Sequence, residues 1–80
     1  MHFVYIIKSN KLGKFYIGET YDIEQRLKYH NSTELNNNST RTGILWVIYH
    51  LIECKNREVA RRIENHIKSM KSRKYIENLK

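Results

Sequence analysis

The chain has 80 residues and a formal net charge of +7, and it contains one cysteine, Cys54. This length fits one small domain, so we expect a single domain over residues 1–80. A lone cysteine excludes an internal disulfide, and the sequence lacks the apolar stretch of a signal peptide or membrane span, so we expect a soluble intracellular protein, cytoplasmic or nucleoid-associated. The charge favours a polyanionic partner, nucleic acid before an acidic membrane surface or an acidic protein.

Two short apolar segments near the N-terminus predict a β-hairpin. Residues 3–7 are rich in β-branched and aromatic side chains, and residues 15–18 form a second strand after a polar turn. Strands this close in sequence pair as an antiparallel hairpin. Because side chains alternate along a strand, one plausible register places Tyr5 and Tyr16 on the same face.

The segment after the hairpin predicts a helix with two polar groups on its apolar side. The helix begins at a capping box at Asp22 and ends near residue 31. The spacing i, i+3, i+4, i+7 puts one set of side chains on one face: Ile23, Arg26, Leu27 and His30. A buried cation without a partner is costly, so Arg26 and His30 lie either at the edge of the core or in a shared polar site.

The middle of the chain predicts a loop followed by a strand. Residues 32–43 are rich in Asn, Ser and Thr, which is typical of a mobile surface loop. Its Thr40-Arg41-Thr42 segment supplies groups suited to contacting phosphates. Residues 44–52 are almost continuously apolar, so we expect a central strand buried on both faces, with Trp46 in the core.

The C-terminal third predicts two helices. The first begins at Asn56 as N-cap, and Glu64 lies beside its apolar stripe. That stripe consists of Val59, Ala60, Ile63, Ile67 and Met70. A last short helix over residues 72–80 would pack Tyr75, Ile76 and Leu79.

The order and spacing of several of these residues carry a resemblance to a known family. The segments are Val4-Tyr5-Ile6 and Phe15-Tyr16-Ile17-Gly18, followed by Arg26, His30, Trp46 and Glu64. The chain thereby resembles the GIY-YIG nuclease superfamily, and most of all its short stand-alone members related to the nuclease domain of the bacterial excision-repair endonuclease. The resemblance spans Val4 to Lys68 and implies an α+β fold, a small three-stranded antiparallel sheet flanked by about three helices.

The resemblance also implies an activity, the hydrolysis of DNA phosphodiester bonds with one divalent cation, Mg²⁺ or Mn²⁺, and a role in DNA repair. Glu64 matches the single metal-binding carboxylate, and Arg26 would stabilise charge on the phosphate. Either Tyr5 or His30 would activate the water, and a tyrosine base would need its pKa lowered by its neighbours. Tyr16 would position the water or the phosphate. No small-molecule cofactor is implied.

A few positions depart from the family pattern. Val4 stands where glycine is commonest, Leu45 replaces a proline, and Val47 replaces a frequent lysine. Asn78 is the nearest match to an asparagine that some members use near the C-terminus. Gly18 would let the backbone and the start of the helix come close to the site.

The basic residues are candidates for DNA contacts. Those we single out are Lys14, Arg41, Lys68, Lys71 and Lys74, with Gly18 beside them, and further candidates are Lys11, Arg61 and Arg73. A nuclease core that relies on phosphate contacts should show slight sequence preference and strong salt dependence. The alternatives are a nucleic-acid-binding module with the same fold that does not cleave, and a structural or protein-interaction domain. A homodimer is possible.

Overall fold

The computed structural model describes residues 1–36 and 39–79, with the backbone alone at positions 39 and 41. Its elements are β1 (His2–Ser9), β2 (Lys14–Thr20), α1 (Ile23–Asn31), the 3₁₀-helix η1 (Ser39–Gly43), β3 (Trp46–Cys54), α2 (Arg57–Met70) and α3 (Arg73–Glu77). The three strands form one antiparallel sheet in the order β2-β1-β3. The expected α+β fold is confirmed.

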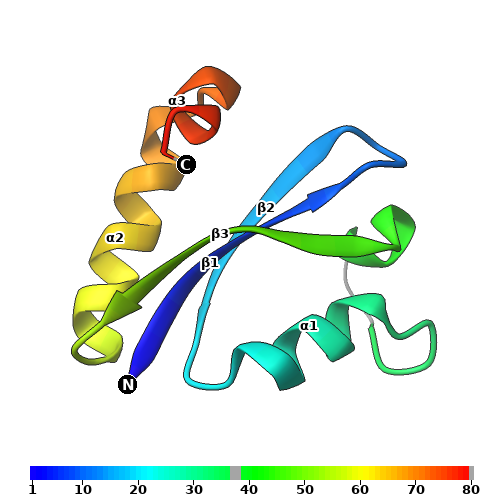
Figure 1. The fold of residues 1–80 in the computed structure, drawn as a ribbon, viewed down its shortest axis with the longest axis horizontal. Helices are drawn as coiled ribbons and strands as arrows, with labels where there is room; N and C mark the ends of the chain where they lie inside the picture. The colour runs from blue at the N-terminus through cyan, green and yellow to red at the C-terminus, as the bar shows by residue number, and fades with distance from the viewer. Residues whose placement is uncertain (37–38, 80) are drawn as a thin grey trace.

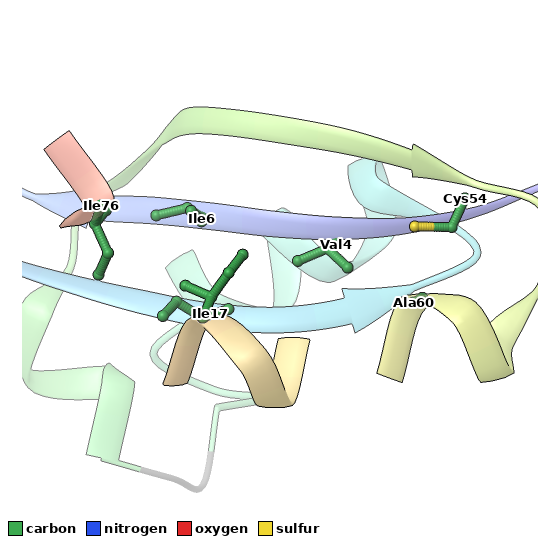
Figure 2. Close-up of a cluster of buried hydrophobic side chains, with 7 residues drawn as sticks. Val4, Ile6, Ile17, Cys54, Ala60 and Ile76 are labelled. Atoms are coloured by element: carbon green, nitrogen blue, oxygen red, sulfur yellow. The ribbon is translucent and has the colours of Figure 1, made fainter. Parts of the chain in front are cut away.

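The sheet separates two sets of helices, as Figure 1 shows. Helices α2 and α3 lie on one side, and α1 with η1 lies on the other. Val4 and Ile6 of β1 point into the cluster beneath α2, where they pack with Ile17, Ala60 and Ile76 (Figure 2). A second cluster on the side of α1 is built from Tyr5, Ile7 and Trp46, with Tyr16, Ile23, Leu27 and Ile44 packed against it. Alternate residues of β1 therefore serve two different cores.

The expectation of a central third strand is wrong, because β1 occupies the centre and β3 is an edge strand. Three apolar residues of β3, Val47, Ile48 and Leu51, are 44%, 43% and 38% exposed. Side chains of β1 pack into a core on each side of the sheet. A β-bulge opposite Ile6 and Ile7 disturbs the register between β1 and β3. A continuous apolar run indicates a strand but does not say where in the sheet it lies.

The described part of the segment between α1 and β3 is more buried than the surface loop we expected, and it includes the 3₁₀-helix η1. Within the described residues, Asn36, Thr40 and Gly43 are buried. The indole Nε1 of Trp46 donates to the carbonyl oxygen of Thr40 at 2.6 Å. A Cβ on Gly43 would collide with the indole, so glycine is required for Trp46 to pack there. Trp46 is 4% exposed, which confirms it as a core residue.

The predicted helix starts are confirmed. The carboxylate of Asp22 accepts from the backbone N–H of Gln25 at 3.1 Å, and the side chain of Asn56 accepts from that of Val59 at 3.0 Å. Both contacts satisfy a first-turn N–H that has no partner within the helix. In the apolar stripe of α2, Ala60 and Ile67 are buried and Val59 and Ile63 are half-buried against the core, whereas Met70 at the end of the helix is 43% exposed.

Asn31 joins the end of α1 to the start of β3. Its Oδ1 accepts from the backbone N–H of Trp46 at 2.6 Å, and its Nδ2 donates to the Trp46 carbonyl oxygen at 2.9 Å. The Asn31 side chain thus bonds both backbone groups of Trp46, as a neighbouring strand would. This contact holds the helix that carries the polar residues of the site.

We therefore expect Asn31→Ala to lower the free energy of unfolding by about 2 kcal/mol, since two backbone groups lose their partner in a partly buried position. Urea unfolding followed by the fluorescence of Trp46 measures this change. Asn65→Ala, at an exposed position of α2, is the matched control and should change stability by less than about 0.5 kcal/mol. Equal losses in the two variants would contradict the assigned role of Asn31.

Candidate active site

The hairpin register brings two tyrosines to one face of the sheet. Tyr5 lies opposite Gly18 and Ile7 lies opposite Tyr16, so both tyrosines face α1. Their ring centroids are 6.3 Å apart. A Cβ on Gly18 would overlap the hydroxyl of Tyr5, and the glycine therefore lets the Tyr5 ring lie across β2. Gly18 makes room for a side chain of the site, a role that sequence reasoning had not assigned to it.

His30 reaches the same place from α1. Its side chain is almost fully buried, and its Nε2 lies 3.0 Å from the Tyr5 Oη in a hydrogen bond. The Tyr16 ring centroid is 4.9 Å from that of His30. Of the two polar groups on the apolar side of α1, His30 is thus the one that enters a polar site inside the protein. Tyr5, Tyr16 and His30 form one contiguous group.

A second set of polar residues holds the far side of the imidazole. The Nδ1 of His30 is hydrogen-bonded to the Thr40 Oγ1 at 2.8 Å. Asn36 donates from Nδ2 to the same Oγ1 at 2.8 Å and to the His30 carbonyl oxygen at 2.9 Å. Sequence reasoning missed Asn36 and Thr40 in this role because it read their segment as a solvated loop. The position of His30 on the apolar side of α1 could have indicated such partners, because a buried histidine needs a partner for each ring nitrogen.

Burial keeps both members of the hydrogen-bonded pair neutral. Burial, together with the smaller effect of the Arg26 guanidinium, lowers the pKa of His30 to about 4. Burial also raises the pKa of Tyr5, and the neighbouring Tyr16 adds to this effect. Arg26 acts in the opposite direction on Tyr5 but does not overcome burial. The lowered tyrosine pKa that a simple tyrosine base would need is therefore not found.

Arg26 lies outside the buried group but acts on it electrostatically. Its side chain is exposed, and its guanidinium carbon is 5.6 Å from the centroid of the Tyr29 ring. It borders two adjoining hollows at the end of β2, of about 260 and 230 Å³. Its charge influences the pKa of both Tyr5 and His30. Arg26 thus occupies the edge of the core, where a solvent-borne anion can reach it.

Glu64 approaches from the opposite side of the sheet, on α2. The carboxylate is only 15% exposed, and its Oε2 accepts from the Lys68 Nζ at 2.7 Å. Its negative charge nevertheless contributes to raising the pKa of Tyr5. Because β2 is an edge strand, groups from both sides of the sheet can meet around it. Glu64 belongs to the surroundings of Tyr5 in spite of its position on a different helix.

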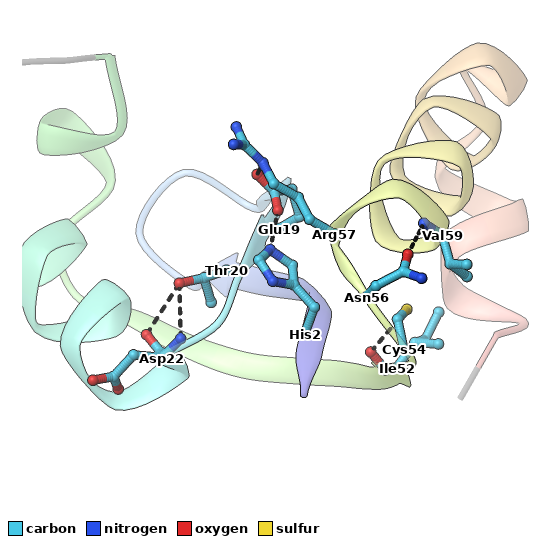
Figure 3. A network of polar contacts seen from close by, with 9 residues as sticks. All are labelled: His2, Glu19, Thr20, Asp22, Ile52, Cys54, Asn56, Arg57 and Val59. Atoms are coloured by element: carbon cyan, nitrogen blue, oxygen red, sulfur yellow. Dashed lines mark hydrogen bonds and ion pairs between the residues drawn. The ribbon is translucent and has the colours of Figure 1, made fainter.

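A second carboxylate, Glu19, lies at the end of β2, and sequence reasoning missed it. Figure 3 shows its side chain between His2 and Arg57. Its Oε2 contacts the His2 Nε2, and its Oε1 lies 3.5 Å from the Arg57 Nε. Glu19 also raises the pKa of Tyr5. The candidate site therefore has a flanking ion-pair network in addition to the expected residues.

The donor set fits a hard divalent cation at Glu64. Mg²⁺ commonly takes one or two carboxylates and completes its shell with water, so one partly buried carboxylate beside open solvent is sufficient. Among residues 1–36 and 39–79 there is no group of three or more His, Cys, Asp or Glu side chains that could hold a metal. Glu64 would have to share its Oε2 with Lys68 or release that contact.

The predicted DNA contacts are only partly gathered together. Lys14, Lys68 and Lys71 line one groove on the side of α2 and α3. Lys74 is exposed on α3, and the side chain of Arg41 lies outside the described residues. Asn78 forms the C-cap of α3. In the part of the chain that is described, no helix has the length and apolarity needed to cross a membrane.

Comparison with known proteins gave one match. The family model described as the GIY-YIG catalytic domain matches residues 1–76 of the 80-residue chain. Neither the curated proteins nor the solved structures contain a match to this chain.

The lowered pKa of His30 predicts how stability depends on pH. The folded protein resists protonating His30 until about pH 4, whereas the unfolded chain takes up that proton near the ordinary value of 6.5. The contribution of the buried, neutral His30 to the free energy of unfolding is therefore fully present above pH 6.5 and is lost as the pH falls towards 4. It amounts to at most about 3 kcal/mol, at 1.36 kcal/mol for each pKa unit.

Urea unfolding between pH 4 and pH 7 measures this effect. We expect the stability of the wild type to fall more steeply with acid than that of His30→Gln, so that the two curves converge at low pH. His66→Gln, at an exposed position on α2, should keep the steep dependence of the wild type. Parallel curves for the wild type and His30→Gln would show that His30 is not the buried neutral group described above.

Proposed function

Since this chain belongs to the GIY-YIG nuclease family, we propose that it is a divalent-metal-dependent endonuclease that hydrolyses DNA phosphodiester bonds. The observation that carries the proposal is the buried hydrogen bond between Tyr5 and His30, within the electrostatic reach of Arg26 and Glu64. An ordinary packing tyrosine needs neither a buried imidazole nor a cation and a carboxylate around it. Phosphodiester hydrolysis has a use for each of these groups: a proton acceptor, a cation that stabilises charge on the phosphate and a carboxylate that holds a metal.

The reaction first requires that water lose a proton as it attacks phosphorus. We assign this step to Tyr5 and His30 acting together. With the Thr40 hydroxyl accepting from Nδ1–H, the Nε2 of His30 is free to accept the phenolic proton of Tyr5. Tyr5 can then take a proton from water while passing its own to His30. This relay does not require a stable tyrosinate, which burial disfavours.

DNA itself would make His30 a better base. The low pKa of His30 arises from burial and from the charge of Arg26. A bound phosphate compensates the guanidinium and adds negative potential, and both effects raise the pKa of the imidazole. The proton affinity of the His30 imidazole, and with it the strength of this base, would therefore rise only when DNA is bound.

Arg26 and Tyr16 have distinct roles in this scheme. The guanidinium of Arg26 stabilises charge on the phosphate through its planar fork of donors, and its exposed position lets a DNA strand reach it. Tyr16 is half-buried beside His30 and positions the attacking water or the phosphate. Glu64 would hold the Mg²⁺ or Mn²⁺ ion, which when bound stabilises charge on the leaving oxygen.

The substrate is bound through its phosphates. The net charge of +7 supports binding to a polyanion, and the basic residues are spread along the chain. We therefore propose low sequence preference, cleavage or nicking of DNA in general, and an affinity that falls steeply with salt.

Cleavage of supercoiled plasmid in low salt tests the proposal. We expect the wild type to nick the plasmid with Mg²⁺ or Mn²⁺ and to stop when a chelator is added. Glu64→Ala should reduce the rate by about a hundredfold or more, which is the scale of losing a group that stabilises transition-state charge.

Glu58→Ala provides the matched control for Glu64→Ala. Glu58 lies on the same helix and forms the same kind of i,i+4 ion pair, with Arg62 at 2.9 Å, but its side chain is 75% exposed. This control should cleave at the rate of the wild type. If the folded wild type binds DNA but cuts no form of it with either metal, the chain is a binding module and the catalytic assignment fails.

Tyr5→Phe tests the proton relay separately. The phenyl ring can still lie over Gly18, so the fold is preserved while the hydrogen bond to His30 is lost. We expect the cleavage rate to fall about 100-fold to 10,000-fold, the usual contribution of proton transfer by a positioned group. Tyr75→Phe, on the other side of the sheet, should have no effect on the rate. A Tyr5→Phe variant that cuts at the normal rate would exclude the relay and leave the water to another base.

A further inference from the structure

A groove outside the Tyr5–His30 group lies between the β1–β2 hairpin and the junction of α2 with α3. Its volume is about 380 Å³, within the range of about 300–1,000 Å³ that is typical of small-molecule sites. Apolar side chains contribute the floor: Phe15, Ile17, Ile67 and Ile76. Three of these four also belong to the core, so the floor is fixed by the packing of the domain.

The rim of this groove is cationic. Lys14, Lys68, Lys71 and Arg73 border it. Lys68 is paired with Glu64, and the Arg73 Nε lies 3.5 Å from the Glu77 Oε2, whereas Lys14 and Lys71 form no ion pair within the described residues. An apolar floor beside the two unpaired lysines of the rim fits an occupant that has an apolar planar body and a negative charge close to it. A nucleobase attached to its phosphates has this composition, and single-stranded nucleic acid is bound in general by aromatic groups within cationic grooves.

The groove is held in shape before anything binds. The Nη1 of Arg73 donates to the Gly13 carbonyl oxygen at 2.7 Å and so joins the hairpin turn to α3. The guanidinium carbon of Arg73 also lies 5.5 Å from the centroid of the Phe15 ring. Lys71 adopts a left-handed conformation with φ of 47° where α2 ends, and this sharp turn sets the wall of the groove. A preformed site loses little conformational entropy when it binds its ligand.

The groove borders one residue of the candidate active site, Glu64. Lys68 lines the groove, and its Nζ is bonded to Glu64, the proposed metal ligand. A DNA strand whose base occupied the groove would run its sugar-phosphate chain past Lys68, the residue bonded to that carboxylate. Resting on the nuclease assignment above, we propose that this groove binds one unpaired nucleotide of the substrate strand, with its base on the apolar floor and its phosphates on the lysine rim.

This occupant defines a class of substrate. A base within a continuous duplex is paired and stacked, so it can reach the groove only after it has left the helix, which costs a few kcal/mol. A base in an overhang or gap does not pay this cost. The preferred DNA should therefore have unpaired nucleotides next to the cleaved bond.

Binding measured by fluorescence anisotropy in the presence of a chelator, so that nothing is cut, tests the proposal. Three labelled DNAs are compared at one salt concentration: a blunt duplex, the same duplex with a short single-stranded overhang, and that overhang with abasic sites in place of its bases. We expect the overhang with bases to bind about tenfold more tightly than either of the others, the scale of stacking one base. The abasic DNA carries the same phosphates and isolates the contribution of the base.

Two protein variants with equal charge separate the groove from general electrostatics. Lys14→Ala combined with Lys71→Gly removes two rim cations, and glycine readily accepts the left-handed conformation at position 71. Lys28→Ala combined with Lys55→Ala removes the same charge at exposed positions that do not line the groove. We expect the first variant to lose the preference for the overhang, and the second to weaken binding to all three DNAs by a similar factor.

The binding experiment tests the groove, and the cleavage experiment tests the nuclease assignment. Equal binding of all three DNAs, or equal binding of the two overhangs, overturns the groove proposal and leaves plasmid cleavage to decide the activity. A protein that prefers the overhang with bases but never cleaves retains the groove and loses the nuclease assignment. Circular dichroism of each variant confirms that it is folded, and Phe15→Leu, which keeps apolar bulk and removes the ring, should reduce the preference without abolishing DNA binding.

Discussion

The candidate site depends on a single requirement, that a buried imidazole must satisfy both of its nitrogens. Tyr5 meets this requirement on one side of the His30 ring and Thr40 meets it on the other. These partners come from the first strand and from the segment after α1, so one histidine joins parts of the chain that are distant in sequence. Asn36 bonds that segment to the end of α1, and Asn31 bonds the end of α1 to the start of β3. Leaving one of these buried polar groups without a partner would cost about 1–3 kcal/mol, so the parts depend on one another.

The position of β2 at the edge of the sheet explains how a domain this small builds a site at all. Helices α1 and α2 lie on opposite faces, yet the charges of Arg26 and Glu64 both act on Tyr5. In a wider sheet a further strand beyond β2 would separate them. The same edge leaves the end of β2 open, where Glu19 pairs with His2 and Arg57. The groove borders the other end of the strand, at Lys14 and Phe15.

Much of the fold could be predicted from local signals, and the errors share a physical cause. The hairpin, the caps at Asp22 and Asn56, and the core position of Trp46 each follow from a short stretch of sequence. The central placement of β3 was wrong because an apolar run does not report how many neighbours a strand has. In the described part of residues 32–43, the expectation of a surface loop was wrong for Asn36 and Thr40, because polar side chains can bury themselves by bonding one another. Spacing identified Tyr5, Tyr16 and His30, but their mutual distances and the neutral state of the pair depend on tertiary packing.

The two partners of β1 differ greatly in their distance along the chain, and this has a consequence for how the protein folds. The β1–β2 hairpin closes over a short turn, whereas pairing of His2 with Cys54 closes a loop that includes most of the chain. Loop closure of this kind is entropically slow, so local contacts form first and the β1–β3 ladder forms later. The pairing of Ser9 with Trp46 belongs to that later stage. We therefore expect the hairpin to place both tyrosines first, and the side of the sheet that faces α1 to gain Trp46 only as the last strand docks.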